Sequence, residues 1–105
     1  MLNLILAGAI SLLVNPQTCF APCHISLVIT VEADKANEKL IIELNSDDYQ
    51  RVSNLDYSNG GPKKLQITYP DVPAGDYEVR VSIHRHDGKS WVAGVATKKV
   101  QVAGN

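Results

Sequence analysis

The side chains with the clearest capacity for chemistry are two cysteines and a histidine near the start of the chain, in the segment Cys19-Phe20-Ala21-Pro22-Cys23-His24. Because the two thiols are close in sequence, they predict a local disulfide in an oxidising compartment. Such a bridge would stabilise the fold by about 2 kcal/mol, since it restricts the unfolded chain. We expect it to brace the entry to the first strand of the domain without linking two sheets.

The same three side chains resemble a longer-spaced variant of the Cys-x-x-Cys-His motif that attaches haem in c-type cytochromes. The resemblance implies haem c as a cofactor, with Cys19 and Cys23 bonded to the vinyl groups and His24 on the iron. His84 or His86 would then supply the second axial ligand. A zinc or copper site from the same residues is a further alternative, although the cysteines lack the matched second half of usual zinc sites.

His84 and His86 are two residues apart on an expected strand, so both side chains lie on the same face of it. That face, which carries His84 and His86, also carries Glu78, Arg80 and Ser82. We expect this face to be wet and both histidines to be solvated surface residues.

The remaining charged clusters predict no catalytic site. Asp47, Asp48 and Asp56 lack the ligand spacing of a calcium loop, so we expect solvated turn residues. The pairs Lys63-Lys64 and Lys98-Lys99 are typical of edge strands protected against aggregation. The sequence has no Gly-x-Ser-x-Gly turn for a nucleophile. We therefore expect a protein that is not an enzyme.

Length and composition place these residues in one small domain. The chain has 105 residues, of which 45% are hydrophobic and 20% charged, enough for a single hydrophobic core. The formal net charge of −1 argues against a nucleic-acid partner, which usually needs a basic surface. The apolar run over residues 2–14 falls short of the ~20 residues of a membrane-spanning helix, so we expect no membrane span.

The first 18 residues form an apolar leader, and the domain is expected over residues 19–105. The first Asp, Glu, Lys or Arg of the chain is Glu32, and residues 2–18 resemble the apolar and polar regions of a secretory signal. No basic residue precedes the apolar run, so alternatives stay open: a membrane anchor, or a retained segment that forms a buried strand or helix or is donated to a neighbouring subunit.

Beyond the leader, apolar and polar residues alternate over 25–33, 40–45, 64–69, 77–84 and 91–102. This period of two is typical of half-buried strands, although residues 32–44 also contain good helix formers. Residues 46–62 are rich in turn formers, with at most a short irregular strand over 49–52. Pro70 is expected to end its strand, since it has no N–H to donate.

This pattern predicts an all-β fold, an antiparallel β-sandwich of about six or seven strands. The inward-facing positions of these strands form the predicted core: Ile25, Leu27, Ile29, Val31, Leu40, Ile42, Leu44, Leu65, Ile67, Tyr77, Val79, Val81, Ile83 and Val100.

Residues 67–102 resemble the second half of a fibronectin type III or immunoglobulin-like domain. The resemblance rests on an apolar strand, the turn Pro73-Ala74-Gly75 and the run Tyr77-Glu78-Val79-Arg80-Val81. It implies an immunoglobulin-like sandwich in which the hydroxyl of Tyr77 bonds to the backbone upstream. The chain departs from these families because its one tryptophan, Trp91, comes late. The resemblance implies no particular ligand.

Taken together, the sequence predicts an exported structural or binding module that acts at a cell surface, outside the cell or in a periplasm. Its partners would be a protein or a carbohydrate, or copies of itself. Two alternatives remain: a small c-type cytochrome for extracellular electron transfer, with subunits that could stack into a filament, and a strand-exchange filament without cofactor.

Overall fold

The computed structural model describes residues 9–57 and 63–104. Within them the chain forms strands only, which confirms the predicted all-β class. The strands are β1 (Ile10–Asn15), β2 (Thr18–Phe20), β3 (Cys23–Val31), β4 (Asn37–Asn45), β5 (Gln50–Asp56), β6 (Lys64–Val72), β7 (Gly75–His86) and β8 (Ser90–Ala103).

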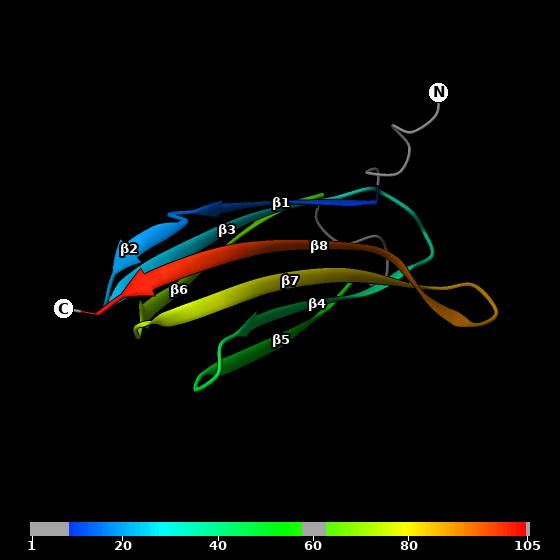
Figure 1. Cartoon of the computed structure of the whole chain (residues 1–105). Coiled ribbons are helices and arrows are strands. Elements are labelled where there is room, and N and C mark those ends of the chain that lie inside the picture. Colours follow the sequence, from blue (N-terminus) through cyan, green and yellow to red (C-terminus); the bar gives the residue numbers. More distant parts are fainter. Residues whose placement is uncertain (1–8, 58–62, 105) are drawn as a thin grey trace, which may run out of the picture.

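The strands form two sheets that lie face to face (Figure 1). The smaller sheet has the order β1-β3-β6, and the larger has the order β2-β8-β7-β4-β5. Nearly all neighbours are antiparallel, but β2 runs parallel to β8. Strands β4 and β7 belong to the larger sheet and β6 belongs to the smaller one. The chain therefore crosses the sandwich between these strands, and the two sheets enclose one core.

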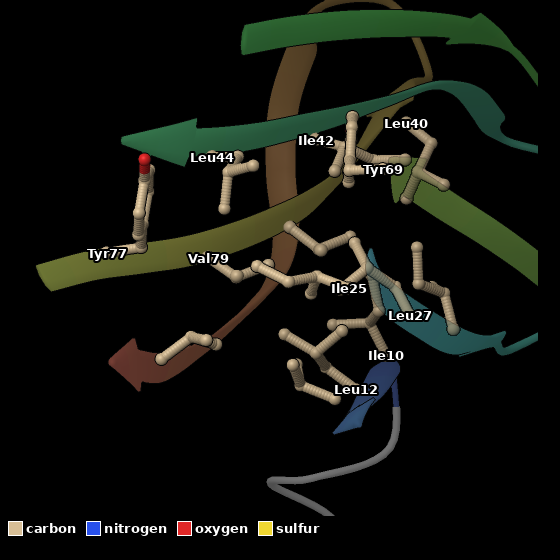
Figure 2. Packing of buried hydrophobic residues seen from close by; sticks show 14 of the residues in the cluster. Ile10, Leu12, Ile25, Leu27, Leu40, Ile42, Leu44, Tyr69, Tyr77 and Val79 are labelled. Carbon is tan, nitrogen blue, oxygen red and sulfur yellow. The ribbon is translucent and has the colours of Figure 1, made fainter. Parts of the chain in front are cut away.

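The core fills the space between the sheets, and its residues come from alternate positions of each strand (Figure 2). Most predicted core residues are buried as expected, including Ile25, Leu40 and Val81. The prediction for Leu65 and Ile67 is wrong in degree, since both side chains are only partly buried. They lie on β6, the edge strand of the smaller sheet, where a side chain has neighbours on one flank only. Residues missing from the predicted core are Ile10, Leu12, Val14, Cys23, Tyr57, Tyr69, Val72 and Val102.

Part of the expected leader belongs to this sandwich. Strand β1 pairs with β3 in an unbroken register from Ile10↔Val31 to Asn15↔Ser26, and its inward side chains are buried. After Pro16 the chain passes to the larger sheet, where β2 pairs with the end of β8. The expected boundary after residue 18 thus falls within β2. Residues 1–8 lie outside the described part of the chain, and removal of the leader stays a prediction.

The segment expected to be mostly turns contains a regular strand. Strand β5 pairs with β4 without interruption from Lys39↔Asp56 to Asn45↔Gln50. Its polar sequence hid it because it is an edge strand with only one buried flank. The helix considered over residues 32–44 is wrong, since β4 covers most of that window between two strands. The turn predicted at residues 58–62 lies outside the described residues.

Pro70 does not end its strand, because β6 continues to Val72. The pairing shifts between Ile25↔Tyr69 and Cys23↔Val72, so Pro70 and Asp71 form a β-bulge opposite His24. A bulge leaves a residue without ladder partners, which removes the objection to proline on this edge strand. Asp71 adopts a φ of 54° there, a left-handed conformation that aspartate tolerates better than most residues.

The predicted role of Tyr77 is confirmed. Its hydroxyl donates a 2.7 Å hydrogen bond to the carbonyl oxygen of Pro73, and its ring packs edge-on against Tyr49 at 5.9 Å between centroids. Burial raises the pKa of the Tyr77 phenol, so the donor proton is retained. Gly75 is needed beside it, because a Cβ at that position would lie 3.2 Å from the Tyr77 ring.

Candidate functional surfaces

The two cysteines form a disulfide, with their Cα atoms 6.2 Å apart. Cys19 lies on β2 and Cys23 on β3, so this bridge joins the larger sheet to the smaller one. The expectation that it would not link the sheets is therefore wrong. The sequence concealed this because Ala21 and Pro22 carry the chain from one sheet to the other within a few residues. The disulfide indicates an oxidising environment, as outside the cytoplasm.

His24 holds the bulge beside this disulfide in place. Its Nδ1 accepts a 3.2 Å hydrogen bond from the backbone N–H of Asp71. An accepting Nδ1 requires the neutral ring with its proton on Nε2. His24 therefore has a structural contact that the sequence did not indicate, since Asp71 is far away along the chain.

The structure places the two candidates for the second axial haem ligand, His84 and His86, far from His24. His24 lies near the Gly75 end of β7, because its bulge adjoins Val72, whereas His84 and His86 lie at the opposite end. At ~3.3 Å per residue along a strand, this separation is roughly 30 Å, which is too far for two ligands of one iron. Both thiols are also joined to each other. Across the described residues, no three His, Cys, Asp or Glu side chains are grouped to hold a metal ion.

The histidine face is less wet than predicted. Ser82 is only 6% exposed, and its hydroxyl lies 3.1 Å from Nε2 of His84. Burial, together with the nearby charge of Lys39, lowers the pKa of His84 below its usual 6.5. His86 is exposed at the start of the hairpin turn, as expected, and its backbone N–H bonds to the carbonyl of Ala36.

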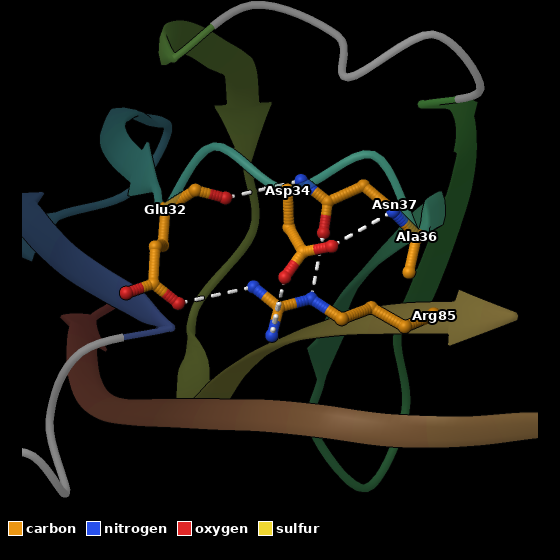
Figure 3. Close-up of polar contacts among 5 residues, drawn as sticks. All are labelled: Glu32, Asp34, Ala36, Asn37 and Arg85. Carbon is orange, nitrogen blue, oxygen red and sulfur yellow. Dashed lines mark hydrogen bonds and ion pairs between the residues drawn. The ribbon is translucent and has the colours of Figure 1, made fainter. Parts of the chain in front are cut away.

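Between these histidines, Arg85 points inward and anchors the turn between β3 and β4 (Figure 3). It is only 7% exposed. Its Nε donates to Oδ1 of Asn37 at 2.9 Å, and its guanidinium pairs with Glu32 at 3.1 Å and Asp34 at 3.5 Å. The ring of Trp91 lies 5.8 Å from the guanidinium carbon. A buried arginine with these partners ties the β7–β8 hairpin to the turn between β3 and β4.

Strand alternation did not predict this cluster, because the inward positions of a strand are normally apolar and a charged side chain is rarely expected there. The available signal was the phase of β7, on which Arg85 continues the inward series of Val81 and Ile83. An inward arginine near a strand end needs acidic partners, but Glu32 lies 53 residues earlier in the chain, so the sequence did not identify which acids these are.

The outer face of the larger sheet carries an apolar patch, which we call the valine patch and define as Ile41, Val52, Val92 and Val95. Val52, Val92 and Val95 are 52%, 51% and 43% exposed. Ile41 and Val95 flank Ser82 on the two neighbouring strands, which explains why that serine is covered. Single exposed apolar residues are ordinary, whereas several that gather on one sheet face are a feature of interaction sites.

Charged side chains border the valine patch. Lys39 and Asp56 face each other across β4 and β5, and Glu43 lies between Val52 and Arg80 in register. Exposed apolar groups and charges of both signs therefore share this face, a mixed composition that is common in protein interfaces.

A groove lies at the end of the same sheet that is away from Val92. This groove, of about 730 Å³, is lined by polar residues of β2, β4, β7 and β8, among them Asn45, Asp76, Glu78 and Gln101. Asp47 also lines it, whereas Asp48 and Asp56 are exposed elsewhere, as expected for solvated residues. Amides and carboxylates in a wide groove offer hydrogen bonds, but the described lining includes no exposed aromatic platform.

The lysine pairs lie at strand edges, as predicted. Lys64 is the first residue of β6, an edge strand, and Lys63 immediately precedes it. Lys98 is exposed although it faces Val79, an inward position. It lies on the part of β8 that β2 does not reach. Inward-pointing charge at a strand edge opposes pairing with other chains.

No helix within the described residues is long and apolar enough to cross a membrane. Comparison with family models finds none that matches the chain, and a search of curated proteins gives no match.

Proposed function

We propose that this protein is an exported, non-catalytic binding module with an immunoglobulin-like or fibronectin type III-like sandwich. Its sheet orders, with a three-stranded sheet against a larger one, are compatible with that architecture. The bond from Tyr77 to Pro73 lies at the crossing from β6 to β7, where those domains have their tyrosine corner. The disulfide supports a place outside the cytoplasm.

We further propose that the valine patch binds a protein partner. The observation that carries this proposal is the exposure of Val52, Val92 and Val95 on one sheet face. An apolar centre gains from burial against another protein by about 25 cal/mol per Å², whereas a carbohydrate would find few hydrogen-bonding groups there. The polar groove is the surface that a carbohydrate would use instead.

Photo-crosslinking in the native host tests this proposal. A photoreactive amino acid replaces Val95 in one variant and Gln66, which is exposed on the outer face of the smaller sheet, in the matched control. We expect a discrete adduct from position 95 that protease digests, and none from position 66. A further Val52→Lys substitution should abolish the adduct without lowering the melting temperature.

Two results would refute the proposal. One is equal labelling from positions 95 and 66, which shows random collision. The other is an adduct that glycosidase removes and protease does not, which assigns the face to a carbohydrate.

A further inference from the structure

Strand β1 fills a groove at one edge of the sandwich. It pairs with β3 along its whole length, while its other flank runs beside β8 without a ladder between the two among the described residues. Three of its side chains, Ile10, Leu12 and Val14, are buried in the core. Figure 2 shows Ile10 and Leu12 directed toward Ile25 and Leu27.

The rest of the sandwich is held together without β1. The disulfide between Cys19 and Cys23 joins the two sheets immediately after it, and the Arg85 cluster ties them at the opposite end. Strand β1 is the first strand of the described residues, and neither of these links passes through it.

The groove is shaped closely to its occupant. A Cβ added at Gly94 on β8 would lie 2.8 Å from Cβ of Ala9 and 3.1 Å from Cγ2 of Ile10. The absence of a side chain at this position lets the start of β1 approach β8. A strand that enters this groove must therefore have a small residue and then an alternating apolar series, which the segment 9–15 has.

We infer that this groove is a strand-acceptor site and that its partner is β1 of a second copy of this chain. The second copy's segment has the same sequence as the strand that now occupies the groove, so every contact of β1 is reproduced between chains, as in domain swapping. Residues 9–15 contain no charged side chain, so no charge repulsion opposes the exchange. This inference does not rest on the valine patch.

The connection after β1 determines how the copies meet. Only Pro16 and Gln17 separate β1 from β2, and three Cα–Cα steps span at most about 11 Å. A swapped β1 must enter a groove that lies within that reach of its own β2. The two copies therefore meet edge to edge beside β8, and short connections of this kind favour swapping.

The other open side of the sandwich is a poorer acceptor. Strand β6 carries Lys64 and the bulge at Pro70, and both features block edge pairing. Between β5 and β6, Arg51 lies 5.5 Å from the Tyr69 ring and Ser53 lies 3.5 Å from its hydroxyl. These contacts cover the space between the sheets on that side.

A cysteine pair that can form only across the exchanged strand tests the inference on the full chain. Leu13 and Val28 face each other in register on the outer face, and Leu13 is 66% exposed. Directly opposed residues lie within the Cα–Cα range of a disulfide. One chain carries Leu13→Cys and the other Val28→Cys, and the two are partly unfolded and refolded together at high concentration.

We expect a heterodimer linked between positions 13 and 28, with the disulfide from Cys19 to Cys23 intact in peptide mapping. In the matched control, the second chain carries Thr68→Cys instead of Val28→Cys. Thr68 lies on β6 and does not adjoin β1. The linked heterodimer should exceed the control about tenfold, because paired thiols meet at a millimolar effective concentration against ~0.1 mM protein.

A single chain with both Leu13→Cys and Val28→Cys provides the second arm. Its own cysteines should bond within the chain, lock β1 in place and abolish dimers. The inference is overturned if the two heterodimers form equally, if the mixed chains stay monomeric after refolding, or if the locked chain dimerises as well as the unlocked chain.

Discussion

Replacing Tyr77 by phenylalanine removes one hydroxyl and tests whether the turn before β7 is held by a single hydrogen bond. The hydroxyl donates to the Pro73 carbonyl at 2.7 Å, while the ring is buried in the core. Phenylalanine keeps the ring and its edge-on contact with Tyr49. The change in unfolding free energy therefore reports the interactions of the hydroxyl, which are the bond to Pro73 and a contact with Ser46.

The expected loss is about 1 kcal/mol, because a typical net hydrogen bond contributes ~0.5–1.5 kcal/mol. The full cost of an unpaired buried carbonyl, up to ~3 kcal/mol, does not apply. Pro73 is exposed, so water reaches its oxygen once the phenol is gone. For a domain of this size, 1 kcal/mol corresponds to a fall in melting temperature of roughly 4–8 °C.

Urea unfolding of the full chain measures this loss, with Tyr49→Phe as the matched control. Tyr49 loses the same hydroxyl, but its partner is Arg51 at 3.4 Å on the surface, so the change should stay within about 0.5 kcal/mol. The midpoint for Tyr77→Phe should fall with an unchanged slope against urea. Equal effects of the two substitutions, or a more stable Tyr77→Phe chain, would refute the role assigned to this bond.

Three further predictions concern the disulfide, the β1 groove and His84. Replacing Cys19 and Cys23 together by serine should lower the unfolding free energy by about 2 kcal/mol, seen as a lower urea midpoint; no change would mean that the bridge between the sheets adds nothing. Gly94→Ala should cost about 1–3 kcal/mol by overpacking against Ala9, and hydrogen exchange should rise first in β1; protection that is lost evenly would contradict this. Because the pKa of His84 is lowered in the fold, the unfolded chain binds more protons, so stability falls as the pH drops below about 6.5; His84→Gln should flatten this fall in pH-dependent unfolding, and an unchanged slope would refute it.

Much of the fold follows from local alternation of residue types. The runs that became β3 and β7 alternate so regularly that class, inward face and most core residues could be stated from the sequence. The role of Tyr77 was implied by the resemblance of residues 67–102 to fibronectin type III or immunoglobulin-like domains, and its bond to Pro73 agrees with that role. These features depend on neighbours along the chain, which the sequence lists directly.

Other features depend on residues that are distant in sequence. The edge strand β5 is polar because it buries one flank only, so its composition resembled a turn. Pro70 is tolerated because the bulge opposite His24 requires no N–H donor there. Neither fact follows from the segment itself, since each depends on which strand lies beside it.

Local alternation of residue types is enough to predict an all-β chain with an inward face for each regular strand, and it leaves a disulfide, haem or a metal as alternatives for Cys19 and Cys23. Strand order and register establish that a disulfide joins the sheets, that residues 10–15 complete the core, that Arg85 is buried beside Glu32 and Asp34 and that exposed valines lie on one face. The physical reason is that periodicity fixes the face on which a side chain lies, whereas strand order and register fix what lies opposite it.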